Sequence, residues 1–316
     1  MNFFKREELE VKFLAVEKLA LVYNLFTTLL IILFYERLEH PQSMLLGRFI
    51  ILAGTFSLIY LYSRYPSKAT RYLRMSSQMF LLNFWYPDTF EFNRMFENLD
   101  HIFASLDFAL FGCQPSLLFE QLCSGLFWRE LFNFGYWMYY PMITIVVTYY
   151  FFLRPRESER CSFIILFSFF IYYILFMFVP VAGPQFYFPV IGEAHALAGI
   201  YPRLETYFNL HPEISIAQEG QGALFTALVG WAQGAGERAT AAFPSSHIGI
   251  STILMFLAWR MKKWLFAELF VVYILLCCAT VYIKAHYLVD AIAGLATGIA
   301  LYLLASLLYK KIFKNS

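Results

Sequence analysis

The sequence predicts an all-α polytopic integral membrane protein, and two observations support this fold class. Hydrophobic residue types make up 60% of the 316 residues and charged types only 15%, whereas soluble domains have roughly 45–50% and about 25%. The apolar residues also form continuous runs, not the alternating pattern of a membrane β-barrel. With a net charge of only +2 and no concentrated basic face, a nucleic-acid partner is not expected.

Eight apolar segments are candidates for membrane-spanning helices, because a bilayer core needs about 20 apolar residues per helix. We expect about six core spans and two additional N-terminal ones. The predicted parts are N-terminal spans in 1–87, an extracytoplasmic amphipathic segment in 88–130, and a membrane core in 131–316. The candidate spans, of which the third and sixth are short, are 14–34, 43–63, 75–87, 131–153, 161–180, 247–259, 264–284 and 287–309.

The basic residues predict the orientation of these spans. Sixteen of the 24 Lys and Arg residues flank the spans on one side of the membrane, and six flank them on the other. The positive-inside rule therefore places both chain ends in the cytoplasm and the loops 88–130 and 181–246 outside. Residues 1–13 are charged and the first apolar run is long enough to span, which predicts an anchor and not a cleaved signal peptide. A cell inner or plasma membrane fits this topology, as does a eukaryotic secretory membrane.

Two stretches of the outward loops have distinct patterns. Apolar residues at helical spacing in 100–127 predict one or two amphipathic helices, either lying on the outer surface or packed as a cap on the bundle. Glycines in 217–238 predict a flexible loop that could move over a site. The five cysteines argue against a disulfide scaffold, although Cys113 and Cys123 could pair in an oxidising compartment.

Polar residues at membrane depth indicate function, and the first cluster of them is Phe243-Pro-Ser-Ser-His247 at the start of the sixth span. Proline and serine before an apolar run predict a helix start, with Ser245 or Ser246 as the cap. The N–H groups of a helix start favour phosphate, and we expect the hydroxyls of Ser245 and Ser246 to bind it as well. His247 adds an acid–base group beside them. The alternative is a capped helix that carries a surface histidine.

The second cluster is His286-Tyr-Leu-Val-Asp290 at the start of the eighth span. The histidine and the aspartate are four residues apart, so on a helix they share one face. A carboxylate that accepts a hydrogen bond from one imidazole nitrogen leaves the other nitrogen as a base, nucleophile or ligand. The alternative is a histidine that only stabilises the interior of the bundle.

Together the clusters are more specific, because the predicted topology places them on neighbouring helices at the same membrane face. Two histidines, a carboxylate and an anion-binding helix start suit in-line phosphoryl transfer, in which one histidine attacks phosphorus and the other protonates the leaving oxygen. A metal site is the rival interpretation. It is weaker because no third strong ligand has suitable spacing, so neither a metal nor a cofactor is expected.

The pair of motifs resembles the type 2 phosphatidic acid phosphatase superfamily, a group of membrane enzymes related in fold to vanadium haloperoxidases. More narrowly, it resembles the branch that contains inositol phosphorylceramide synthase. The resemblance covers about residues 130–309. It implies that His286 is the nucleophile, Asp290 its orienting partner and His247 the general acid, and that 131–316 is a catalytic membrane core. Ser246 stands where the superfamily's Pro-Ser-Gly-His motif has glycine.

This sequence also departs from the superfamily's basic motifs. The Ser-Arg positions of the third motif fall on Ala279 and Thr280, so the superfamily's phosphate-binding arginine is missing. Lys284 is the remaining candidate for positive charge near the phosphate. The alternative is a lysine that only extends its side chain to the membrane interface. The first motif has neither Lys nor Arg, which leaves Gln185 and Tyr187 as the hydrogen-bond donors nearest to phosphate, unless this segment is only a tight Gly-Pro turn. The dipeptide at 154–155 has the right residues but is predicted to lie across the membrane.

The missing cations favour a phosphodiester substrate, because a phosphodiester carries one negative charge and a phosphomonoester nearly two. We therefore expect transfer of a phospho-head-group from a donor such as phosphatidylinositol to a ceramide-like lipid hydroxyl through a phosphohistidine. One alternative is hydrolysis of phosphatidic acid, phosphatidylglycerol phosphate or an isoprenoid diphosphate by the same residues. The other is a non-catalytic transporter or scramblase. Membrane lipids are the expected partners, and the sequence does not predict an oligomeric state.

Overall fold

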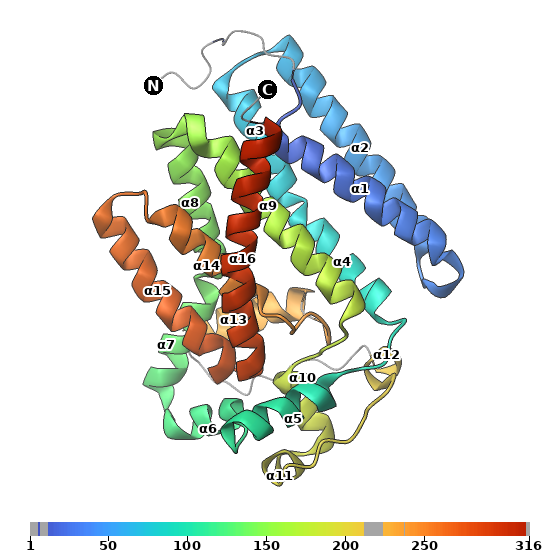
Figure 1. Ribbon diagram of the computed structural model, residues 1–316, viewed down its shortest axis with the longest axis vertical. Helices are drawn as coiled ribbons and strands as arrows, with labels where there is room; N and C mark the ends of the chain where they lie inside the picture. Colours follow the sequence, from blue (N-terminus) through green and yellow to red (C-terminus); the bar gives the residue numbers. More distant parts are fainter. Residues whose placement is uncertain (1–5, 7–11, 212–223, 237, 314–316) are drawn as a thin grey trace.

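The computed structural model is a helical bundle (Figure 1), and it describes residues 6, 12–211, 224–236 and 238–313. Within this part of the chain the elements are helices, and the bridge between Arg6 and Ser67 is isolated. Five helices are long and apolar enough to cross a membrane, which confirms the predicted fold class and the corresponding five spans. They are α1 (Ala15–Leu33), α2 (Pro41–Arg64), α9 (Pro155–Phe178), α15 (Lys263–Tyr282) and α16 (Leu288–Phe313).

The other three predicted spans are not single long helices. The segment around 75–87 is divided into two helices at Leu81. The segment 131–153 is also divided, because one helix ends at Trp137 and the next begins at Tyr139. The sixth predicted span is a helix of 13 residues, about 20 Å long at 1.5 Å per residue, which is shorter than a hydrocarbon core of about 30 Å. These helices are α3 (Lys68–Phe80), α4 (Leu82–Asn93), α7 (Leu126–Trp137), α8 (Tyr139–Leu153) and α14 (Ser246–Ala258).

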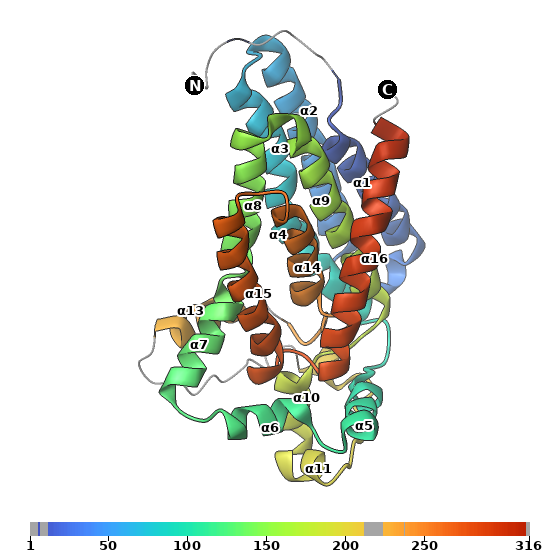
Figure 2. The same ribbon diagram turned by 60° about the vertical axis from the view of Figure 1, so that its left-hand side comes forward.

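Helix α9 lies at the centre of the bundle, with α4 and α1 on one side and α8, α14 and α16 on the other (Figures 1 and 2). In its most apolar stretch of 18 residues, 72% of the residues are buried inside the protein, against 28% for α15. A helix that is apolar all round is buried by its neighbours. The core of the fold therefore surrounds α9, whereas α2 and α15 leave most of their apolar surface outside it.

Helices α14 and α16 approach each other closely through glycines. A Cβ atom added to Gly298 would lie 2.6 Å from the carbonyl oxygen of Gly249, and one added to Gly294 would lie 2.5 Å from that of Ser245. Small residues four apart are the usual means by which membrane helices bring their backbones together. This contact fixes the relative position of the two helices that begin at the predicted motifs.

Short helices and loops cover one end of the bundle, which we call the site end. Helices α5 and α6 run across this end (Figure 2) and are bent by 63° relative to each other, so we place them outside the spanning segments. They confirm the prediction of helices in 100–127. The short elements are η1 (Tyr35–Arg37), α5 (Asp100–Phe111), α6 (Pro115–Leu122), α10 (Pro184–Ile191), α11 (Glu193–Leu197), α12 (Tyr207–Leu210) and α13 (Leu224–Gly236).

The expectation of a flexible loop in 217–238 is wrong for 224–236, which form α13 and pack against α7. The backbone N–H groups of Phe225 and Thr226 at the start of this helix donate to the Glu130 carboxylate, at 2.9 Å each. This cap allows a glycine-containing segment to be helical. Residues 217–223 lie outside the described part of the chain. Cys113 and Cys123 are free thiols, so the structure does not contain the disulfide between them.

Candidate active site

The structure brings the two motif histidines together at the site end. The ring centroids of His247 and His286 are 5.7 Å apart, with an angle of 63° between the ring planes. His247 lies in the first turn of α14. His286 lies in the turn that precedes α16 and not on the helix itself, so the expectation that it shares a helix face with Asp290 is wrong in detail.

The hydrogen-bond partner of His286 differs from the expected one. Its Nδ1 lies 2.8 Å from the carbonyl oxygen of Ala242, and a carbonyl can only accept, so Nδ1 carries the proton. The lone pair of the neutral ring is then on Nε2. The carboxylate of Asp290 is 3.8 Å from Nδ1, and its Oδ2 accepts from the backbone N–H of Tyr287 at 2.9 Å. Asp290 therefore lies within ion-pair range of the ring, while the carbonyl sets the tautomer.

Two tyrosines hold the ring of His247. Tyr136 of α7 stacks on it with centroids 4.7 Å apart, and Tyr139 of α8 contacts it at 4.5 Å with a tilt of 45°. The helix break between α7 and α8 places both rings here. In the described part of the chain, Nδ1 of His247 is buried and has no hydrogen-bond partner. Such a nitrogen can exchange a proton with a bound substrate oxygen.

The predicted helix start at the first motif is present. Ser245 is the N-cap of α14, and its hydroxyl accepts a hydrogen bond from the N–H of Ile248 at 3.4 Å. The hydroxyl of Ser245 thus stabilises the helix, and its side chain is fully buried. Ser246 begins the helix, so its N–H and that of His247 have no intrahelical acceptor four residues back. These two N–H groups are the part of the motif that is suited to phosphate oxygens.

The side chain of Lys284 is engaged by two carboxylates, contrary to the expectation that it faces phosphate. Its Nζ lies 2.8 Å from Oε2 of Glu120 and 3.2 Å from Oε1 of Glu193. Burial lowers the pKa of Lys284, but these contacts outweigh burial and raise the pKa above its ordinary value. The lysine is therefore charged, and its charge is compensated by the protein itself.

The segment that replaces the superfamily's first motif is mainly structural. The hydroxyl of Tyr187 donates to the carbonyl oxygen of Pro202 at 2.7 Å, which gives it a packing role in place of the expected contact with phosphate. The backbone N–H of Gln185 donates to the Lys284 carbonyl at 2.8 Å, and its side chain accepts from Gln233 at 3.3 Å. Gly183 has φ of 98°, a conformation that favours glycine, so the tight turn is present.

The dipeptide at 154–155 connects α8 to α9 at the opposite end of the bundle from the site (Figure 1). This placement confirms that the dipeptide is separated from the two histidines. Potential metal ligands gather, among the residues that the structure describes, at Glu39, His40 and Glu91, and the site histidines are not part of that group. The expectation of a reaction without a metal stays a prediction.

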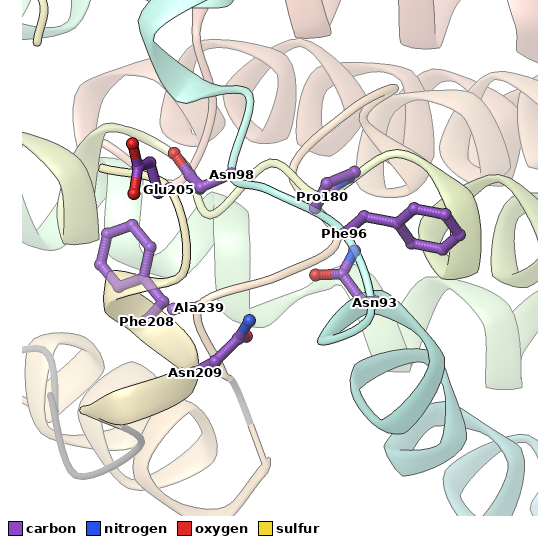
Figure 3. A pocket seen from close by; sticks show the side chains of 8 residues that line it. All are labelled: Asn93, Phe96, Asn98, Pro180, Glu205, Phe208, Asn209 and Ala239. Atoms are coloured by element: carbon purple, nitrogen blue, oxygen red, sulfur yellow. The ribbon is translucent and has the colours of Figure 1, made fainter. Parts of the chain in front are cut away.

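A small polar pocket lies at the site end between α4, α12 and the end of α9 (Figure 3). Two of its polar side chains form hydrogen bonds within the protein. Asn93 donates to the Phe176 carbonyl at 2.7 Å, and Asn209 donates to the Arg94 carbonyl at 2.9 Å. Neither histidine lines it. The residues that line it are Asn93, Phe96, Asn98, Pro180, Glu205, Phe208, Asn209 and Ala239.

Sequence reasoning missed several residues around the histidines. The carbonyl of Ala242 and the rings of Tyr136 and Tyr139 have no sequence signature. Two carboxylates of α5, Asp100 and Asp107, accept hydrogen bonds from the backbone of the turn after α9 and from the start of α16, just after His286. Their signal was present in the sequence, because each is an acidic residue within an apolar helix.

The fold and the paired histidines define a polytopic membrane protein whose site is equipped for acid–base and nucleophilic chemistry. A family model described as the PAP2 superfamily matches residues 101–304. The chain belongs to this superfamily, which is a family of phosphoesterases. Comparisons with characterised proteins and with solved structures give no match.

Proposed function

We propose that this protein transfers a phospho-head-group from a phosphodiester lipid, such as phosphatidylinositol, to the hydroxyl of a ceramide-like lipid. The observation that supports this proposal is the pair of histidines, whose ring centroids are 5.7 Å apart. Nδ1 of His286 donates to a carbonyl, and Nδ1 of His247 is buried with no hydrogen-bond partner among the described residues. A nucleophile beside a second acid–base group is the arrangement that covalent phosphoryl transfer requires.

In the first step, Nε2 of His286 attacks phosphorus and a phosphorus–nitrogen bond forms. The bond between phosphorus and the diacylglycerol oxygen breaks, and His247, which is protonated on both ring nitrogens at the start of the cycle, gives that oxygen a proton. The N–H groups of Ser246 and His247 stabilise the negative charge on the crowded phosphorus. The carboxylate of Asp290, 3.8 Å from Nδ1, stabilises the positive charge that develops on the His286 ring.

In the second step, the hydroxyl of the acceptor lipid attacks the phosphohistidine. His247 takes the hydroxyl proton, the new phosphorus–oxygen bond forms, and the phosphorus–nitrogen bond breaks. Both histidines return to their initial state, so the cycle is balanced without an additional reactant. Water in place of the lipid hydroxyl would make the same cycle a hydrolysis.

The preference for a phosphodiester follows from the charges. Lys284, the cation nearest to His286 in sequence, is compensated by Glu120 and Glu193. A phosphomonoester dianion needs more positive charge than a singly charged phosphodiester. The polar residues of the site lie at one end of the bundle, whereas a transporter places charged groups on discontinuous helices near the bilayer midplane.

We also propose that the site end faces away from the cytoplasm. The turns and helix ends rich in Lys and Arg, at the end of α2, between α8 and α9 and at the end of α16, lie opposite the site end (Figure 1). The positive-inside rule places such segments in the cytoplasm.

The test uses purified full-length protein in detergent with three substrates: phosphatidic acid, a lipid diphosphate, and phosphatidylinositol mixed with ceramide. Free phosphate and new lipid species are measured separately. A phosphoinositol lipid that forms only when ceramide is present supports the proposal. Phosphate release from the monoesters without any transfer product contradicts it and makes the protein a phosphatase.

A further inference from the structure

Helix α5 has its charged side facing the protein and its apolar side facing outward. The side chains of Asp100 and Asp107 are fully buried, whereas those of Ile102, Leu106 and Leu110 are exposed. An amphipathic helix that packs as a cap normally buries its apolar stripe. The two carboxylates are seven residues apart, two helical turns, so they share one face. Something at the site end must therefore compensate two buried carboxylates.

Asp107 caps the helix that follows His286. Its Oδ2 accepts from the N–H of Leu288 and its Oδ1 from the N–H of Val289, at 2.9 Å each. These are free N–H groups at the start of α16, and a carboxylate is favoured at this positive end of the helix. The start of α16 is thus occupied by a carboxylate of the protein, which leaves the start of α14 for phosphate.

Asp100 holds the segment on the other side of the site. Its Oδ2 accepts from the N–H of Ala182 at 2.6 Å, and its Oδ1 accepts from the N–H of Gly183 at 2.8 Å. Its Oδ1 also accepts from the hydroxyl of Tyr287 at 2.9 Å. One carboxylate therefore joins the turn after α9 to the residue that follows His286.

Both carboxylates act on the His286 ring indirectly, through the backbone. The N–H of Ala242, whose carbonyl accepts from Nδ1 of His286, donates to the Val181 carbonyl at 2.9 Å. Val181 precedes the pair of N–H groups that Asp100 binds. Asp107 binds the two residues that follow Tyr287. Helix α5 thus fixes the backbone that follows the histidine and the turn after α9 that supports Ala242.

We propose that Asp100 and Asp107 are positioning residues of the reaction, which hold the nucleophile His286 in line with phosphorus by binding the backbone around it. This inference rests on the proposed function only in its choice of His286 as nucleophile, and it applies equally to transfer and to hydrolysis. Neither carboxylate touches substrate. A displacement of the nucleophile by about 1 Å lowers the rate about 10²-fold.

The test compares Asp107→Asn and Asp107→Ala in purified full-length protein. Asparagine retains one acceptor oxygen and alanine retains none. The expected result is a graded decrease in kcat, about tenfold for Asn and about 10²-fold for Ala, with KM for the donor lipid unchanged. The partial recovery in Asn relative to Ala distinguishes positioning from a general loss of stability. An unchanged kcat in folded Asp107→Ala, or an effect on KM alone, overturns the proposal.

Two controls separate positioning from stability. Ser105→Ala lies on the same helix, where the hydroxyl donates only to the His101 carbonyl at 2.6 Å, and kcat should not change. Asp88→Asn removes a buried carboxylate that pairs with Arg48 in the N-terminal helices, and it should lower thermal stability without changing kcat of the folded protein. A decrease in kcat in the Asp88 variant equal to that in Asp107→Asn would overturn the proposal.

A second readout needs no substrate and so separates this inference from the proposed function. Diethyl pyrocarbonate modifies neutral imidazole, and peptide mass spectrometry measures the rate at His286. Asp107→Ala should change this rate severalfold, and Ser105→Ala should not. If wild-type protein shows only hydrolysis, the transferase proposal fails while the kcat comparison and the modification rate still test positioning. An unchanged modification rate together with an unchanged kcat overturns the positioning role.

Discussion

Buried charged side chains occur both in the N-terminal helices and at the site end, but their partners differ. In α1–α4, Arg74 binds Glu17 through Nε and Nη2, at 2.8 and 2.6 Å, and Arg48 pairs with Asp88. At the site end, the carboxylates of Asp100 and Asp107 bind backbone N–H groups. The ion pairs hold helices to one another, whereas the site carboxylates hold the turn after α9 and the start of α16 in place.

The comparison indicates why the two regions use different partners. An ion pair within the membrane is compensated by its own members, and it specifies which helices pack together. A carboxylate bound to backbone N–H groups is stabilised by those donors, and it fixes the backbone segments that carry them. We therefore expect variants of the N-terminal region to change stability and variants of the site end to change the rate.

The largest expected effect is the loss of the nucleophile. His286→Ala should lower turnover at least about 10³-fold, because the proposed covalent intermediate forms on this side chain. His247→Ala should also abolish transfer, since the leaving oxygen is then not protonated. Product formation by the purified variants measures both, with thermal stability checked in parallel. Substantial activity in folded His286→Ala would show that the nucleophile is a different residue.

Breaking an N-terminal ion pair should have the largest effect on stability. Asp88→Ala leaves the Arg48 guanidinium buried and unpaired, and about 3–5 kcal/mol of stability should be lost. The double variant Asp88→Leu with Arg48→Met should recover most of this loss, because the pair is replaced by apolar side chains. Thermal unfolding in detergent measures both. A large decrease in kcat of the folded double variant would contradict the separation between the two regions.

A variant at the glycine contact between α14 and α16 tests whether this contact positions the two histidines. Gly298→Ala places a methyl group 2.6 Å from the Gly249 carbonyl, so the helices must separate, at a cost of about 1–3 kcal/mol. We expect stability and kcat to fall together, since His247 then moves away from His286. Gly54→Ala in α2 is the matched control, because its methyl group would meet nothing within 4 Å.

Expected stability in the control variant is unchanged or higher by up to about 1 kcal/mol, as alanine is the better helix former. If the two alanine variants behave alike in both stability and kcat, the contact between α14 and α16 does not position the histidines.

The sequence was sufficient to predict the long helices and the paired motifs. Hydrophobic segments of membrane length, and polar residues within them, have few alternative explanations. The sequence was insufficient where tertiary contacts decide the structure. Segment 224–236 contains glycines and is helical because Glu130 caps it and α7 packs against it. The short helix α14 shows the same limit, since hydropathy gives the position of a span but not its length.

The candidate site was predictable in its residue types and not in its hydrogen bonds. The sequence identified His247, His286 and Asp290, but the partner of Nδ1 is the backbone carbonyl of Ala242, and any residue carries a carbonyl. Lys284 was assigned to phosphate because the motif arginine is absent. Its partners in the structure, Glu120 and Glu193, are remote in sequence. Contacts between distant segments carry no periodic signal.

A smaller effect is expected for Asp290→Asn. The carbonyl of Ala242 still accepts from Nδ1 of His286, so the tautomer is retained, and the amide oxygen of asparagine can still accept from Tyr287. Only the negative charge 3.8 Å from the ring is lost. We expect kcat to fall about tenfold, equivalent to about 1.4 kcal/mol, with little change in stability. An unchanged kcat would show that this charge does not stabilise the imidazolium.

The smallest effect is expected at Lys284. Its partners raise its pKa, so the ion pairs persist below the ordinary pKa of lysine and are lost only when the pH rises past the raised value. The difference in stability between the wild type and Lys284→Met should therefore be constant between about pH 6 and pH 9. Because such half-exposed pairs are worth about 0–1 kcal/mol, stability should change by no more than that, and KM for phosphatidylinositol by less than about fivefold.

A large increase in KM in Lys284→Met, measured against Glu193→Gln as the control for the broken ion pair, would place the ammonium group on the substrate phosphate. The site would then have a cation available for a dianion, and the argument for a phosphodiester substrate would lose its basis. A small change in both variants leaves the two backbone N–H groups at the start of α14 as the principal phosphate contacts. That outcome supports a singly charged donor, because a dianion held by neutral N–H groups without a cation would bring more uncompensated charge into the site.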